Sequence, residues 1–128
     1  METATELKLS HIGQIAMPVH DIRRATAFYR DVLGLRFLFE APPALAFFDC
    51  DGVRLMLSVP ETAEHNHPGS ILYFIVPDIR AAVESLRTRG ARIVAEPTMV
   101  AKMPDHELWM AFFHDGERNT LALMCEVR

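Results

Sequence analysis

The sequence predicts an α+β fold in which one strand–helix–strand–strand–strand unit is used twice. The first observation is a repeated motif: Val19-His20-Asp21-Ile22-Arg23 and Val76-Pro77-Asp78-Ile79-Arg80 both follow a short apolar run. The second is that both motifs lead into helix-like stretches that end on a glycine, Gly34 and Gly90. An internal repeat indicates a supersecondary unit used more than once. The chain therefore reads as two βαβββ modules.

Length and composition predict one globular domain over residues 1–128, with modules at about 9–59 and 70–127. Half of the 128 residues are hydrophobic and 23% are charged, which is enough for a core and ordinary for a globular protein. The net charge of −4, without a run of Lys or Arg, argues against a nucleic-acid partner. The acidic, polar start at Met1–Glu6 predicts no signal peptide, and no apolar run approaches the roughly 20 residues of a membrane span. Cys50 and Cys125 lack metal-type spacing, so we expect reduced thiols and a cytoplasmic location.

Apolar periodicity and turn residues place the elements of the first module. Strands are expected at 12–19, 35–40, 45–49 and 53–59. A helix is expected from its cap at Asp21 to Gly34, because apolar residues recur at helical spacing between them. The pair Asp51-Gly52 supplies the backbone angles of a tight hairpin.

The second module repeats this plan after a polar linker at 60–69. Strands are expected at 70–76, 91–101, 108–114 and 120–127, with the second of these interrupted by Pro97. Asp78 is expected to cap a helix that ends at Gly90. Residues 115–119 are interpreted as a turn, in which Arg118 takes a place where glycine often adopts a positive φ.

Three stretches resemble the vicinal oxygen chelate superfamily, which includes glyoxalases, bleomycin-resistance proteins and extradiol dioxygenases. The first runs from Ile12–Val19 through Asp21-Ile22 to Ala27–Leu35, with its run Phe-Tyr-Arg-Asp-Val-Leu-Gly-Leu. The other two are Tyr73–Ile79 and the ending Asn119–Leu123. The resemblance implies that the two modules form a curled mixed sheet around a ligand-binding cleft. It also implies a homodimer, because many members dimerise.

The superfamily usually places four metal ligands in that cleft, two from each module. Carried over position by position, the four places hold Gln14, Met56, Ile71 and Ala122. Only Gln14 has a side chain that could ligate a metal, and a catalytic metal needs about three protein ligands. We therefore expect no metal and no cofactor.

Strand alternation predicts which side chains share the cleft with these four positions. The predicted ligand-binding set is Gln14, Arg54, Met56, Ser58, Tyr73, Trp109 and Ala122. The cleft as a whole is expected to be mostly apolar, as small-molecule sites are, with Gln14, Arg54, Ser58, Tyr73 and Thr120 as its polar points. Three of the polar residues also have an interpretation that involves no ligand. Arg54 could lie at an edge with its guanidinium in water, and Tyr73 and Gln14 could be buried with a hydrogen-bond partner.

His106 and Glu107 are the candidate catalytic residues. They form the only adjacent acid–base pair that leads into a predicted cleft strand, within Pro104-Asp105-His106-Glu107-Leu108-Trp109. Alternation sends the two side chains to opposite faces, so only one of them can reach the cleft. The alternative is that His106 fixes the preceding loop by hydrogen bonding.

Two classes of function remain open. The first is a metal-independent module that binds a small, partly apolar molecule, anionic in one reading, which Arg54 would then clamp. The second is a lyase, isomerase or dioxygenase-type enzyme of the same superfamily that uses His106 or Glu107, or an unrecognised metal site. Metal analysis of the purified protein would separate these classes most cheaply.

Overall fold

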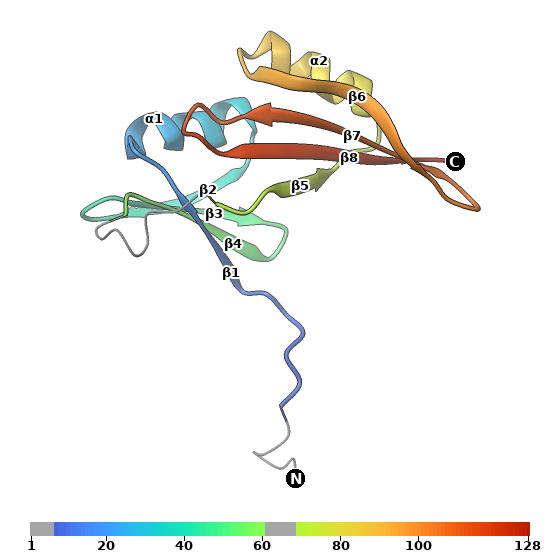
Figure 1. Ribbon diagram of the computed structural model, residues 1–128. Coiled ribbons are helices and arrows are strands. Elements are labelled where there is room, and N and C mark those ends of the chain that lie inside the picture. The colour runs from blue at the N-terminus through green and yellow to red at the C-terminus, as the bar shows by residue number, and fades with distance from the viewer. Residues whose placement is uncertain (1–6, 61–68) are drawn as a thin grey trace.

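The computed structural model describes residues 7–60 and 69–128, so the predicted linker lies almost entirely outside the described residues. The first module contains β1 (Gln14–Pro18), α1 (Ile22–Ala27), the π-helical turn η1 (Phe28–Val32), β2 (Arg36–Ala41), β3 (Leu45–Cys50) and β4 (Val53–Ser58). The second contains β5 (Leu72–Ile75), α2 (Ile79–Thr88), β6 (Arg92–Lys102), β7 (Glu107–His114) and β8 (Thr120–Val127). The predicted βαβββ repeat is confirmed (Figure 1).

The two modules form two four-stranded mixed sheets of the same plan. The first sheet has the order β1-β4-β3-β2 and the second β5-β8-β7-β6. In each sheet the first strand pairs in parallel with the fourth, and the other pairs are antiparallel. The α+β fold class is therefore confirmed. None of the helices within the described residues is long and apolar enough to cross a membrane.

Both helices begin at the predicted aspartates. Asp21 Oδ1 accepts from the Arg24 backbone N–H at 3.1 Å, and Asp78 Oδ1 accepts from the Ala81 N–H at 3.1 Å. The first helix is not uniform, however, because it widens from α1 into η1, where the Leu33 N–H donates to the Phe28 carbonyl at 3.1 Å. A bond from residue i to i−5 defines a π turn, which apolar periodicity does not reveal.

Two other local predictions had different outcomes. Asp51 and Gly52 both take positive φ, 51° and 95°, as a two-residue hairpin of the predicted kind requires. The expected interruption at Pro97 is wrong, because β6 runs through it from Arg92 to Lys102. The strand tolerates proline because it is an edge strand whose register shifts between Ala95 and Thr98.

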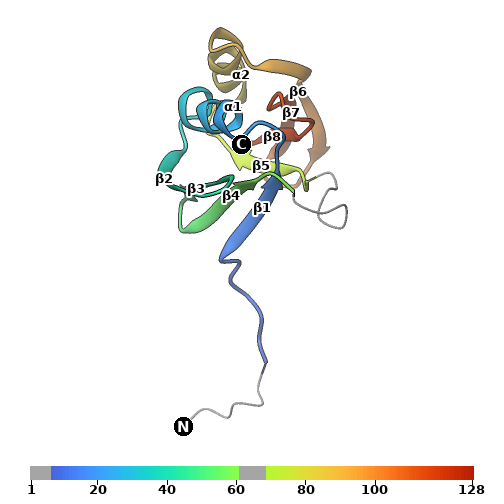
Figure 2. The same ribbon diagram turned by 90° about the vertical axis from the view of Figure 1, so that its left-hand side faces the viewer.

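The core lies on the helix side of both sheets and is continuous between the modules. Figures 1 and 2 show α1 and α2 on the same side of the strands. The largest fully buried side chains come from both modules: Tyr29, Phe48, Phe113, Met17, Leu55, Leu57, Leu121, Val19 and Val83. Each sheet therefore has its other face, here called its outer face, directed away from this core.

Polar contacts also join the modules. The Tyr29 hydroxyl donates to Asp115 Oδ2 at 2.6 Å, and the Asn119 side-chain amide donates to the Pro18 carbonyl at 2.9 Å. Glu117 Oε1 accepts from the backbone N–H groups of His20 and Asp21. The turn between β7 and β8 is thereby attached to the start of α1, and its Arg118 has a φ of 74°.

Candidate functional site

The outer face of the first sheet brings together three of the predicted binding residues. The parallel register of β1 and β4 pairs Gln14 with Arg54 and Ala16 with Met56. The Gln14 side-chain amide donates toward Met56 Sδ at 3.8 Å, so two of the four metal-ligand positions are in contact. Ser58 lies further along β4, half-buried, and its carbonyl accepts from the Val19 N–H at 2.9 Å.

Arg54 is the cationic group of this face. Its guanidinium carbon lies 5.7 Å from the centre of the Phe47 ring, which is a cation–π distance. The cross-strand neighbour Asp49 accepts from the Gly52 N–H at 3.2 Å, and within the described residues Arg54 forms no ion pair. The guanidinium is therefore exposed beside apolar and amide groups, which is an arrangement suited to a carboxylate or sulfonate.

The outer face of the second sheet carries Tyr73 and Ala122, which are register partners in β5 and β8. Ala122 is also paired with Phe112 of β7, whose ring meets that of Tyr73 edge to face at 6.0 Å. Ala122 is fully buried, whereas Tyr73 is 45% and Ile75 79% exposed. This face is apolar and open to solvent.

The donor atoms at the four metal-ligand positions do not fit a divalent cation. Gln14 offers an amide, Met56 a thioether, and Ile71 and Ala122 offer only hydrocarbon. Zinc, manganese and iron sites use His, Cys or carboxylate ligands. Across residues 7–60 and 69–128, no three His, Cys, Asp or Glu side chains gather as a metal site would require.

His106 lies just before β7, between two carboxylates. Its Nδ1 is 2.7 Å from Asp105 Oδ1 and its Nε2 is 3.9 Å from Glu126 Oε2, and the imidazole side chain is only 15% exposed. His106 and Arg128 hold the pKa of the Asp105 carboxyl below its ordinary value through hydrogen bonds. Such a histidine could hold and release a proton. His106 lies six residues before Phe112, the register partner of Ala122, which is roughly 20 Å along the strand, and so it is not beside the Tyr73 cluster.

The expectation that Trp109 lines the same face as Tyr73 and Ala122 is corrected. Trp109 pairs with Cys125, whose side chain is in the core, so alternation places the indole on the helix side. There its Nε1 donates to Glu107 Oε1 at 3.0 Å, and the guanidinium of Arg80 lies 5.3 Å from its ring centre. Glu107 is turned to that side as well, so of the two catalytic candidates only His106 can serve the outer face.

Sequence reasoning missed three residues of the outer faces: Phe47, Phe112 and Glu126. Phe47 is the cross-strand partner of Met56, and Phe112 that of Ala122. Extending the alternation argument to β3 and β7 would have found both, because strands next to the ligand positions share their face. The approach of Glu126 to His106 depends on how the loop before β7 folds, which has no signal in the sequence.

Comparisons with known proteins agree with this fold. The family model of the Glyoxalase/Bleomycin resistance protein/Dioxygenase superfamily matches residues 11–103. A Glyoxylase-like domain-containing protein of Didymella fabae is 29% identical over 126 residues, which cover 88% of this chain and 91% of that protein.

Two solved structures show the same fold. A member of the glyoxalase/bleomycin resistance protein/dioxygenase superfamily from Sphaerobacter thermophilus superposes with a TM-score of 0.74 at 22% identity, covering 94% of this chain and 100% of that one. Lactoylglutathione lyase from Agrobacterium tumefaciens superposes with a TM-score of 0.70 at 21% identity, covering 92% and 95%.

Proposed function

Because the chain belongs to the Glyoxalase/Bleomycin resistance protein/Dioxygenase superfamily, we propose that its outer faces bind a small, partly apolar anion without a divalent metal. The observation that carries this proposal is the replacement of the ligand set by Gln14, Met56, Ile71 and Ala122, next to an exposed Arg54. The apolar side chains would hold the hydrocarbon of the ligand and the guanidinium its charge.

A second copy of the chain would complete this site. The helix-side faces of both sheets are used by the shared core, so the outer faces of one chain are directed away from it. We propose that the outer face of the first sheet meets that of the partner's second sheet across a dimer. Arg54 of one copy and Tyr73 of the other would then lie on opposite walls of the ligand site.

The metal part of the proposal is tested by thermal unfolding with ZnCl₂, MnCl₂ or NiCl₂. We expect no rise in Tm, because ions that find no ligands cannot stabilise the native state by mass action. The positive control is the triple variant Met56→Glu, Ile71→His and Ala122→Glu, which gives all four positions a donor and should gain a metal-dependent Tm. A metal that survives dialysis of the wild-type protein near one equivalent, and whose removal lowers Tm, would refute this part.

The ligand part is tested with benzenesulfonate, an apolar anion, by following the backbone amide signals of Ala16 and Met56. We expect Arg54→Gln to weaken binding by about tenfold or more, because a charged hydrogen bond contributes about 1.5–3 kcal/mol. Arg23→Gln is the matched control, since this exposed arginine belongs to α1 on the helix side. Equal weakening by both variants would indicate general charge attraction instead of a site.

The enclosure of His106 favours a second candidate, a metal-independent lyase or isomerase in which His106 is the general acid/base. Lactoylglutathione, the compound in the name of the Agrobacterium tumefaciens lyase, is the substrate to try, with ultraviolet detection of the loss of its thioester. If His106 is catalytic, His106→Gln should lose about 10²- to 10⁴-fold in rate. The binding proposal predicts no turnover by either protein, with or without added metal.

A further inference from the structure

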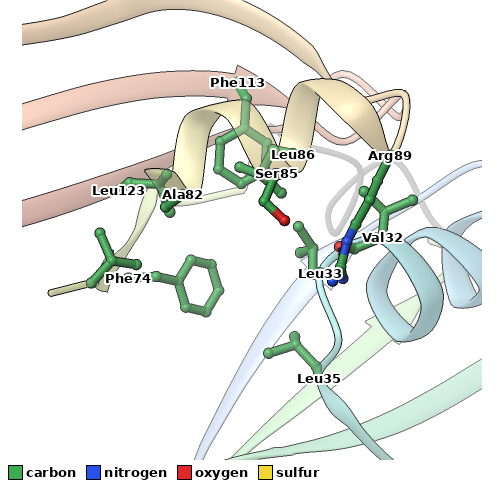
Figure 3. A pocket seen from close by; sticks show the side chains of 11 residues that line it. Val32, Leu33, Leu35, Phe74, Ala82, Ser85, Leu86, Arg89, Phe113 and Leu123 are labelled. Atoms are coloured by element: carbon green, nitrogen blue, oxygen red, sulfur yellow. Dashed lines mark hydrogen bonds between the residues drawn. The ribbon is translucent and has the colours of Figure 1, made fainter. Parts of the chain in front are cut away.

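A cavity lies on the helix side of the molecule, where the two modules meet. It has a volume of about 300 Å³ and opens between the η1–β2 corner and α2 (Figure 3). Its walls come from both modules and are formed by Val32, Leu33, Leu35, Phe74, Val76, Ala82, Ser85, Leu86, Arg89, Phe113 and Leu123. It shares no residue with the outer faces, so it is a separate site.

The walls are apolar and reach the core. Phe113 and Leu123 at the inner end are buried, and Phe74 and Leu35 are half-buried. Only two of the lining side chains are polar, those of Ser85 and Arg89. In Figure 3 the Ser85 hydroxyl and the Arg89 guanidinium stand on the same side of the cavity, opposite Phe74. A volume of this order with few polar points is typical of small-molecule sites.

Arg89 is held at the mouth of the cavity by local structure. It is the C-terminal cap of α2 and precedes Gly90, whose φ of 91° turns the chain away. From there its side chain crosses to the first module, where Nη1 donates to the Val32 carbonyl at 3.2 Å. A guanidinium has five N–H donors, so most of them remain for a ligand. Within the described residues Arg89 forms no ion pair, in contrast to Arg87, which is paired with Glu84 and Glu96.

We infer that this cavity binds a compact apolar monocarboxylate. Its carboxylate would accept from the Arg89 guanidinium and the Ser85 hydroxyl, and its hydrocarbon would lie against Phe74, Leu86 and Leu123. One arginine matches one negative charge, because the lining includes no other charged side chain. Burial of the hydrocarbon contributes about 0.8 kcal/mol per methylene, so the chain of the ligand supplies most of the affinity.

Octanoate is the probe for this site, with binding measured by calorimetry and by the amide signals of α2. At the cavity, where the amide signals of α2 report binding, we expect saturable binding of one octanoate and a loss of about tenfold or more in Arg89→Gln, since the charged hydrogen bond is removed. Arg92→Gln is the control, because this exposed arginine is three residues away and outside the cavity. Octylamine, with the same chain and the opposite charge, should bind at least tenfold more weakly than octanoate.

Filling the cavity provides the second arm of the test. Ala82→Phe should abolish octanoate binding at the cavity while it leaves Arg89 and Ser85 in place, and the smaller filling variant Ala82→Leu serves if the first variant does not fold. The inference is overturned if octanoate does not bind, or if the filled variant binds it as well as the wild type does. Arg54→Gln should leave the response of the α2 amide signals to octanoate unchanged, and Arg89→Gln should leave the response of the Ala16 and Met56 amide signals to benzenesulfonate unchanged. Failure of this inference is thereby distinguishable from failure of the proposed function.

Discussion

Tyr29 shows how a single hydroxyl group joins the two modules. It is fully buried, and its hydroxyl donates to Asp115 Oδ2 at 2.6 Å across 86 positions of sequence. Asp115 also accepts from the N–H groups of Glu117 and Asn119, so its carboxylate is solvated by protein donors. We expect Tyr29→Phe to lower the free energy of unfolding by about 1–3 kcal/mol, because one donor to a buried carboxylate is lost.

Urea unfolding measures this change, and Tyr73→Phe is its control. The Tyr73 ring is 45% exposed, so removal of its hydroxyl should change stability by less than about 0.5 kcal/mol. Equal effects of the two variants would contradict the structural role of the Tyr29–Asp115 bond.

The same residue predicts how stability depends on alkaline pH. Burial, and then the Asp115 carboxylate, raise the pKa of Tyr29 well above its ordinary value. Above about pH 10 the unfolded chain therefore releases this proton while the folded protein keeps it. The contribution of Tyr29 to the free energy of unfolding is fully present below pH 10 and is lost as the pH rises above it. The loss is at most about 1.4 kcal/mol per pH unit. When the free energy of unfolding, measured with urea, is plotted against pH, its decrease above pH 10 should be less steep in Tyr29→Phe than in the wild type. An equally steep decrease in both proteins would contradict the prediction.

Sequence predicts the position of Tyr29 but not its partner. Helical spacing correctly places the ring on the buried face with Ala25. The hydrogen bond to Asp115 depends on how one module packs against the other, and local patterns carry no information on that. The prediction that Trp109 lines the cleft was wrong for a related reason. Alternation shows which residues of a strand share a face, and only the register with the neighbouring strand shows which of the two faces is directed to the core.

Among the elements, the two helices are capped at their N-termini in the same way. Removal of either cap should therefore lower the free energy of unfolding by a similar amount. Asp21 and Asp78 each accept one backbone N–H three residues ahead. We expect Asp21→Ala and Asp78→Ala each to lower the free energy of unfolding by about 1 kcal/mol, and the double variant by about the sum, because the caps are in different modules. Chemical denaturation checks this, with Thr88→Ser on the exposed surface of α2 as the control. A double variant no worse than either single one would contradict independent caps.

Most elements were predictable because their signals are local. The caps, the closing glycines and the Asp51-Gly52 turn each specify a backbone conformation within a few residues. The π turn at η1 and the continuous β6 were not predictable, because a wider helical turn and a bulged edge strand leave the same apolar pattern. The outer face of the first sheet was predictable because strand alternation is a local pattern. The cavity beside Arg89 was not predictable, because its walls come from both modules.

At the scale of the whole molecule, the exposed apolar residues predict a two-fold homodimer. Ile75 is 79% exposed on the outer face of the second sheet, and residues 7–13 extend away from both sheets, with Leu9 88% exposed (Figure 1). We expect light scattering at micromolar concentration to give the mass of a dimer, with more than about 1,200 Å² buried in total. Ile75→Lys should shift the protein toward monomer, whereas Ala81→Lys on the exposed side of α2 should not. A monomeric mass for the wild type would contradict the prediction.

The core that runs through both modules has a consequence for how the protein unfolds. Neither half can lose its structure without exposing buried surface of the other, so the repeat does not make two independent folding units. The far-ultraviolet circular dichroism of the whole chain and the fluorescence of Trp109, which reports the second module, should therefore follow one coincident urea transition. Expressed alone, the second module should lack a cooperative transition, because the surface that Tyr29 and its neighbours cover would face water.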